Sequence, residues 1–134
     1  ALKIPMASVF GPTLAGGPRG SPVVQRQEQP VMNTGPGVQR RLIVRDTRHD
    51  IEIAENTYLP GAASADRPIH HLGREFGVVL SGRMQIEVDG RTHVLQRGDA
   101  ISFDSSMPHR FANIGKEVAR TIWVNVHSSR SSRR

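Results

Sequence analysis

A chain of 134 residues, 37% of them hydrophobic and none of them cysteine, has room for one domain with its own core. The lack of cysteine excludes a disulfide framework, a zinc site built on thiolates and a cysteine nucleophile. The longest uninterrupted apolar run is three residues, whereas a membrane span needs about 20. We therefore expect a cytoplasmic protein with no membrane contact.

The formal net charge is +6, which taken alone would indicate a nucleic-acid partner. Residues 1–40 have four basic groups and one acidic group, residues 41–127 have eleven of each, and residues 128–134 have three arginines and no acid. The two ends thus carry the whole excess. Because the middle of the chain is neutral, it is expected to hold a pocket rather than a DNA-binding face.

The N-terminal segment has the composition of a connector. Six of the nine prolines and six of the thirteen glycines fall within the first 37 residues. Residues 11–37 are therefore predicted to form a mostly extended Pro/Gly-rich linker or arm, with a short strand near residues 23–26. At the other end, residues 128–134 contain no apolar side chain and are predicted to form a disordered basic tail.

Residues 38–127 have an all-β pattern of short alternating segments separated by turn residues. Met84, Ile86 and Val88 alternate with polar residues, and Asp89-Gly90 then supplies a two-residue hairpin turn. The expected strands cover residues 40–45, 50–59, 75–80, 84–88, 91–95, 100–103, 109–112 and 121–127. This regular spacing predicts a sandwich or barrel.

Two histidines and a glutamate are candidates for a metal site. In an extended strand Ile69 and His71 point one way and His70 the other. A tight turn after His71 would bring Glu75 beside it, and His109 comes from a separate strand. Two imidazoles and a carboxylate form a plausible facial triad for a divalent metal. The alternative is a solvated pair of histidines at positions 70 and 71 and a hydrogen-bonded His109 in a loop.

The spacing of these residues resembles the two sequence motifs of the cupin superfamily. The matching positions are Gly61, His71, Glu75 and Gly82, and then Gly98, His109 and Asn113. The resemblance implies a single-domain cupin over residues 38–127, a double-stranded β-helix or jelly-roll barrel with an extended N-terminal arm. It also implies a ligand pocket, for which we expect the lining residues Ile69, Met84, Ile86, Phe103 and Phe111.

The chain departs from the cupin pattern in two places. Ile69 stands where the first histidine of the family's His-x-His falls, and Asp104-Ser105-Ser106 replaces a Pro-x-Gly. The family's metal set therefore carries over only to His71, Glu75 and His109, which would hold a divalent Fe, Mn, Ni or Zn ion, unless a strand bulge brings His70 inward. His93 shares a face with Ile86 across the hairpin and is interpreted as a packed residue, not a ligand.

Residues 1–10 resemble the exit of a helix-turn-helix domain of the XRE type. The alternative is an unrelated arm that packs on the barrel. Since the chain begins with alanine, it is interpreted as a processed or excised piece. The resemblance implies the sensor domain of a transcriptional regulator, a homodimer that binds a small polar effector and meets DNA only through an absent N-terminal domain. The alternatives are a metal-dependent dioxygenase or isomerase using the His-Glu-His site, and a binding or storage cupin.

Overall fold

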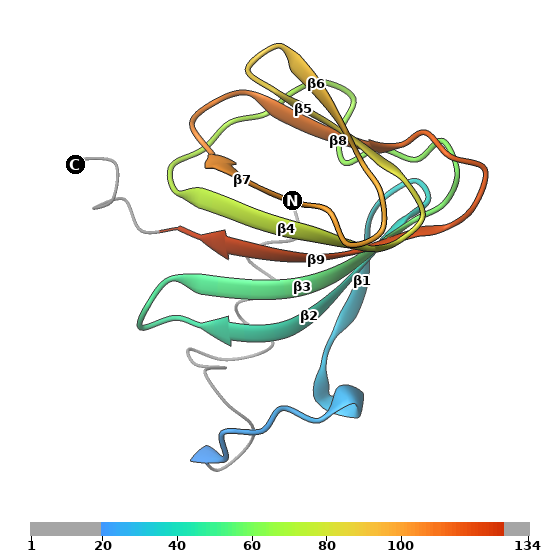
Figure 1. Ribbon diagram of the computed structural model, residues 1–134. Coiled ribbons are helices and arrows are strands. Elements are labelled where there is room, and N and C mark those ends of the chain that lie inside the picture. The colour runs from blue at the N-terminus through green and yellow to red at the C-terminus, as the bar shows by residue number, and fades with distance from the viewer. Residues whose placement is uncertain (1–19, 128–134) are drawn as a thin grey trace.

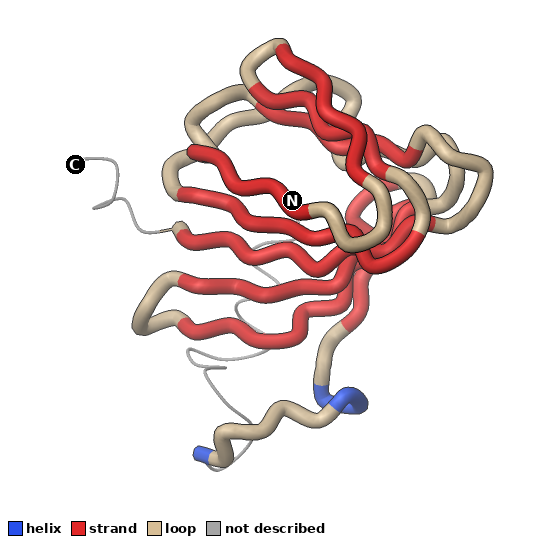
Figure 2. The backbone as a smooth tube through the Cα atoms, in the orientation of Figure 1, coloured by secondary structure: helices blue, strands red, loops and turns tan. Residues whose placement is uncertain are grey.

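Two antiparallel sheets face each other across the interior of the protein (Figures 1 and 2). The computed structural model describes residues 20–127. Its elements are the 3-10 helix η2 (Arg26–Glu28) and the strands β1 (Val31–Gly35), β2 (Val38–Asp46), β3 (Ile51–Tyr58), β4 (Arg74–Ser81), β5 (Met84–Val88), β6 (Arg91–Leu95), β7 (Ala100–Asp104), β8 (His109–Asn113) and β9 (Ala119–Val126). The larger sheet has the order β1-β2-β3-β9-β4-β7, and the smaller one β6-β5-β8. The all-β prediction is confirmed.

The alternation of side chains decides which face of each strand is buried. In β5, Met84, Ile86 and Val88 are buried, whereas the residues between them are half-buried. Asp89 and Gly90 have φ angles of 51° and 79°, as a two-residue hairpin with both central residues in the left-handed region requires. The predicted hairpin is confirmed, with Val88 opposite Arg91.

The core lies between the two sheets and combines aliphatic with aromatic side chains. Its members are Val38, Tyr58, Val79, Met84, Ile86, Val88, Leu95, Phe103, Phe111, Ala119 and Trp123. The Trp123 ring fills the space above Gly77, where an added Cβ would lie 2.0 Å from the indole Cζ3 atom. Gly77 is thus required by the close approach of the indole ring.

The N-terminal segment differs from the prediction of a connector over residues 11–37. Its last part forms β1, which pairs with β2 and so belongs to the larger sheet. The strand expected near residues 23–26 is absent from the described chain, and η2 begins at Arg26. Residues 31–35 have little alternation, so backbone pairing with β2 forms this strand rather than its own pattern. The predictions for residues 1–10 and 128–134 lie outside the described residues.

Within residues 20–127, no helix is both long enough and apolar enough to cross a membrane.

Asn113, at the end of β8, ties three backbone segments together. Its Nδ2 donates to the carbonyl oxygens of Tyr58 at 2.9 Å and Glu117 at 2.8 Å, and its Oδ1 accepts from the Gly115 N–H at 2.9 Å. Because Asn113 is 1% exposed, Asn113→Ala is expected to lower the free energy of unfolding by about 2–3 kcal/mol. Urea denaturation measures the loss, and the exposed Asn33→Ala serves as the control; an equal effect of both variants would contradict the assignment.

Candidate metal centre

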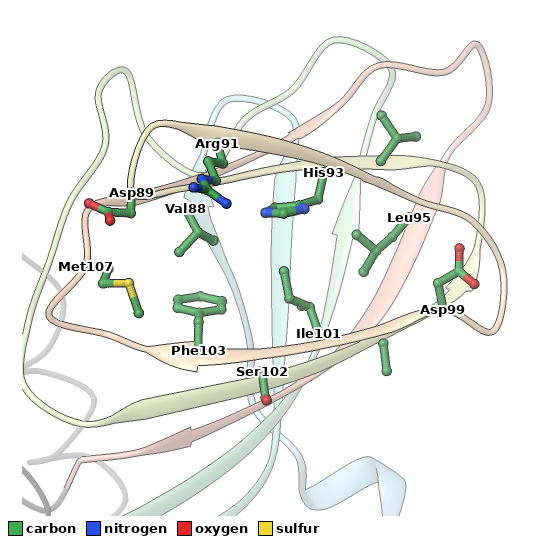
Figure 3. Close-up of a pocket in the computed structure, with 12 residues that line it drawn as sticks. Val88, Asp89, Arg91, His93, Leu95, Asp99, Ile101, Ser102, Phe103 and Met107 are labelled. Atoms are coloured by element: carbon green, nitrogen blue, oxygen red, sulfur yellow. The ribbon is translucent and has the colours of Figure 1, made fainter.

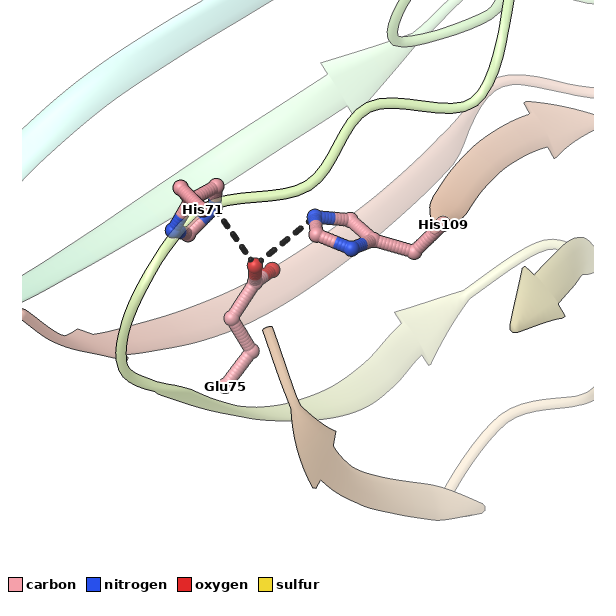
Figure 4. A group of neighbouring side chains, drawn as sticks. All are labelled: His71, Glu75 and His109. Atoms are coloured by element: carbon pink, nitrogen blue, oxygen red, sulfur yellow. Dashed lines mark ion pairs between the residues drawn. The ribbon is translucent and has the colours of Figure 1, made fainter. Parts of the chain in front are cut away.

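Three side chains from separate parts of the fold meet at one end of the barrel (Figure 4). His71 lies in the loop before β4, Glu75 lies in β4 and His109 is the first residue of β8. Gly73 turns the chain between the first two with a φ of 119°, and a Cβ there would lie 2.1 Å from the Val126 carbonyl oxygen. The expected tight turn after His71 is thus observed, and it depends on glycine.

One carboxylate oxygen faces both imidazole rings. Glu75 Oε2 lies 3.0 Å from His71 Nε2 and 2.9 Å from His109 Nε2. Glu75 and His109 are buried, whereas the His71 side chain is 37% exposed. The cluster is therefore held in the interior and opens to solvent on the side of His71.

Backbone carbonyls fix the orientation of both rings. His71 Nδ1 lies 3.1 Å from the Leu72 carbonyl oxygen, and His109 Nδ1 lies 2.8 Å from that of Met107. Since a carbonyl only accepts, both Nδ1 atoms carry the proton. Nε2 is then the ring atom that can donate to the carboxylate when it is protonated, or bind a metal ion when it is not. Histidines that bind a metal commonly donate their other ring N–H to a backbone carbonyl in this way.

Charge pairing sets the protonation of the cluster. Burial raises the pKa of Glu75, but the contact with His109 and the hydrogen bond from Trp123 outweigh it, so the net pKa lies below the ordinary value. For His109, burial lowers the pKa, yet the Glu75 carboxylate and the Met107 carbonyl raise it overall. An added cation would take over the role that an imidazole proton otherwise has.

The donor set fits a divalent transition metal. The three ligand atoms all lie within 4.8 Å of one another. Glu75 Oε2 is buried between the two Nε2 atoms and has no hydrogen bond of good geometry, so a cation there would satisfy a polar atom that the fold leaves without a well-placed donor. Two imidazoles and one carboxylate suit Fe(II), Mn(II), Ni(II) or Zn(II). His71, Glu75 and His109 would hold the ion.

The other predicted site residues differ in burial and in how near they lie to the cluster. His70 is outside the His71–Glu75–His109 cluster. Ile69 is 49% exposed, and Met84 and Ile86 are fully buried in the core. Phe103 and Phe111 are buried, and their rings lie 5.1 Å and 5.6 Å from the His109 ring. Contact of a ligand with these five residues stays a prediction.

Trp123 is not among the residues that the sequence predicts for the site. In the structure Trp123 Nε1 donates to Glu75 Oε1 at 2.7 Å and so orients the carboxylate. The signal that could have identified it is register, because β4 and β9 are paired and place Trp123 opposite Gly77, on the face that also carries Glu75. A glycine paired with a tryptophan on the neighbouring strand indicates that the indole ring lies over the glycine, where any other side chain would clash with it.

A charged cluster lies beside the exposed ring of His71. The His127 ring lies 6.1 Å from that of His71, and Glu52 accepts from Arg40 at 3.1 Å. His127 Nε2 lies 3.6 Å from Glu52 Oε1. The pKa of His127 is raised mainly by this carboxylate, and that of Glu52 is lowered mainly by His127. A ligand that reaches His71 from solvent thus meets polar groups first.

The fold and the cluster agree with the family model of the cupin domain, which matches residues 54–125. The chain belongs to the cupin family. The HTH-type transcriptional regulator PuuR of Escherichia coli (strain K12) is 28% identical to it over 101 residues, which make up 75% of this chain and 54% of the regulator. The chain spans about half the length of this curated relative.

Solved cupin structures include both regulators and enzymes. An HTH_3 family transcriptional regulator from Vibrio cholerae is 26% identical, with a TM-score of 0.62, and the match covers 69% of this chain and 52% of that one. A predicted oxalate decarboxylase from Thermotoga maritima is 19% identical, with a TM-score of 0.67 over 79% of this chain and 99% of that one. The second likeness shows the fold alone. This cupin domain is thus related to regulator domains and shares its fold with enzymes.

Ile69, at the position of the missing histidine, lies directly opposite His109. The two residues exchange backbone hydrogen bonds of 2.9 Å and 2.8 Å, so their side chains lie on the same face. Ile69→His is therefore expected to add a fourth ligand and to tighten Ni(II) or Zn(II) binding about tenfold. Isothermal titration calorimetry measures it, with the exposed Leu80→His as the control. An affinity equal to that of the unchanged protein would show that position 69 does not reach the ion.

Proposed function

We propose that this chain is the small-molecule-sensing cupin domain of a transcriptional regulator and works in the cytoplasm. The observation that carries the proposal is its relation to helix-turn-helix regulators over the barrel, at 28% identity to the E. coli regulator and 26% to the V. cholerae regulator. In this proposal DNA is bound by a domain outside the chain. The neutral charge of residues 41–127 supports that division of roles.

The proposed effector is a small polar molecule that enters the barrel beside His71. The cluster offers an anionic carboxylate and two imidazoles, with Phe103 and Phe111 packed around His109. These groups suit a ligand with cationic, hydroxyl or metal-chelating groups. A divalent ion held by His71, Glu75 and His109 would supply a Lewis-acidic anchor for an effector oxygen or nitrogen.

The proposed mechanism is thermodynamic linkage in a homodimer. An effector that binds one arrangement of the dimer more tightly shifts the paired DNA-binding domains by no more than its differential affinity. Support for a dimer comes from the outer face of the larger sheet. There Phe76 and Leu80 are 40% and 42% exposed, and Phe76 lines a shallow apolar groove with Val78, Ile122 and Val124. A second copy would cover this face.

The test uses the complete regulator polypeptide that contains this domain. Its binding to DNA from its own promoter region is measured by fluorescence anisotropy while a library of polar metabolites is screened. We expect one metabolite class to change the DNA affinity at least about fivefold and to raise the melting temperature of the isolated domain. A polypeptide that binds no DNA, or a DNA affinity that no metabolite changes, would overturn the proposal.

A second candidate function is a metal-dependent cupin enzyme. The observation that favours it is the His71–Glu75–His109 cluster itself, since such a set suits Fe(II) or Mn(II). Oxygen consumption or isomerisation by the Fe(II)- or Mn(II)-loaded domain, lost in Glu75→Gln, would support the enzyme. Loss of DNA regulation in the same variant without any turnover would favour the sensor.

A further inference from the structure

The two sheets leave a gap between their edge strands β6 and β7. In the described chain β6 pairs with β5 alone and β7 pairs with β4 alone, so no backbone ladder joins them. A pocket of about 660 Å³ lies in this gap. That volume is within the range of small-molecule sites. Figure 3 shows the pocket with the β5–β6 hairpin on one side and β7 on the other.

The pocket has an apolar wall and a few polar groups. The apolar side chains include Val88, Leu95, Ile101, Phe103 and Met107. Arg91 and His93 extend into the gap from β6, and Asp89 and Asp99 lie toward its two ends (Figure 3). The positively charged Arg91 and the imidazole of His93 therefore lie in the middle, over Phe103 and Ile101.

The strand register explains why these polar groups face inward. Arg91 lies opposite Val88 and His93 lies opposite Ile86, and both partners are buried. Directly opposite residues share a face, so Arg91 and His93 lie on the barrel side of β6. His93 shares a face with Ile86 as predicted, but its interpretation as a packed residue is wrong. The ring is exposed and lines the pocket, because no strand covers the edge of β6.

Neither polar group is used by the fold. Within residues 20–127, neither the Arg91 guanidinium nor the His93 imidazole makes a hydrogen bond or an ion pair. Arg91 is thus not paired even with the nearby Asp89. Asp99, in contrast, is engaged in its own turn, where its Oδ2 accepts from the Gln96 N–H at 2.9 Å. An unpaired guanidinium beside an apolar wall is suited to bidentate binding of a carboxylate.

We propose that the pocket between β6 and β7 binds a small organic anion, a carboxylate carried on an apolar or aromatic body. The carboxylate accepts hydrogen bonds from Arg91 and His93, and the body packs on Phe103 and Ile101. This site is separate from the metal centre and goes beyond the proposed sensing function. The Phe103 ring lies between the two, 5.1 Å from the His109 ring, so the anion does not ligate the ion and binds the metal-free protein.

The test uses benzoate and hexanoate as probes and benzamide as the neutral counterpart of benzoate. Chelator-treated protein is titrated and followed by two-dimensional amide NMR. We expect saturable shifts in the amides of β6 and β7, with a dissociation constant of about 1 mM or tighter for one carboxylate, and at least about tenfold weaker binding of benzamide. The absence of saturable shifts with both carboxylates, or equal binding of benzamide, would overturn the proposal.

Two variants separate the pocket from general surface charge. Arg91→Gln and His93→Gln are expected to weaken carboxylate binding, the first about tenfold or more. Arg97→Gln, which removes an exposed arginine outside the pocket lining, leaves it unchanged. An equal loss in the Arg97 and Arg91 variants would assign the binding to net charge and refute the site. Because metal is absent throughout, failure here leaves the proposed sensing function intact.

Discussion

His109→Ala abolishes divalent-metal binding, with an expected loss of affinity of at least about 100-fold. The physical reason is that His109 Nε2 and Glu75 Oε2 are buried together 2.9 Å apart, so loss of the imidazole leaves a site in the interior with only two of its three protein ligands. Calorimetric titration with Ni(II), Zn(II) and anaerobic Fe(II), after treatment with a chelator, measures the change.

Two further variants make the result specific. His71→Ala removes the more exposed ligand, 37% exposed, and should also weaken binding while the fold persists. His70→Ala alters the neighbouring histidine, which lies outside the cluster, and should change nothing. If the unchanged protein binds no divalent ion, or if His70→Ala weakens binding as much as His71→Ala does, the cluster is not a metal site.

Gly77→Ala destabilises the protein by about 3 kcal/mol or prevents its folding. The added methyl group would lie 2.0 Å from Trp123 Cζ3 and 2.2 Å from Cε3, so the indole ring has to leave its place in the core. The hydrogen bond from Trp123 Nε1 to Glu75 Oε1 would then break. Thermal and urea denaturation measure the loss of stability.

The matched control is Gly35→Ala in β1. An added Cβ at Gly35 meets no atom within 4 Å, so this variant should unfold within about 0.5 kcal/mol of the unchanged protein. Equal stability of the two alanine variants would contradict the packing of the indole ring on Gly77.

Local patterns were sufficient to predict strands β2 to β9 and the β5–β6 hairpin. Apolar alternation at Met84, Ile86 and Val88 and the turn at Asp89-Gly90 both reflect neighbouring residues, and the structure has them as predicted. The approach of His71 to Glu75 could also be predicted, because a single tight turn separates them. His109 was a candidate because it lies on a separate strand, and the family motif supported its place beside Glu75, a contact that links residues far apart in the chain.

Features that depend on pairing between distant strands could not be predicted. β1 forms by backbone pairing with β2, and its own residues show little of the apolar alternation that predicts a strand. His93 is exposed because β6 is an edge strand that pairs with β5 alone. The residues around His93 do not indicate that its strand lies at an edge. The contact of Trp123 with Glu75 depends in the same way on the register of β4 and β9.

Because Trp123 donates a hydrogen bond to Glu75, its intrinsic fluorescence can report on the metal centre. Trp123 is the single tryptophan of the chain, and its indole N–H is bound to the carboxylate that faces both imidazoles. Intrinsic fluorescence therefore comes from one ring whose polar end reports on Glu75. Binding of Ni(II) or Fe(II) should quench the emission in proportion to occupancy, and Glu75→Gln should remove the response, so metal loading can be followed without a label.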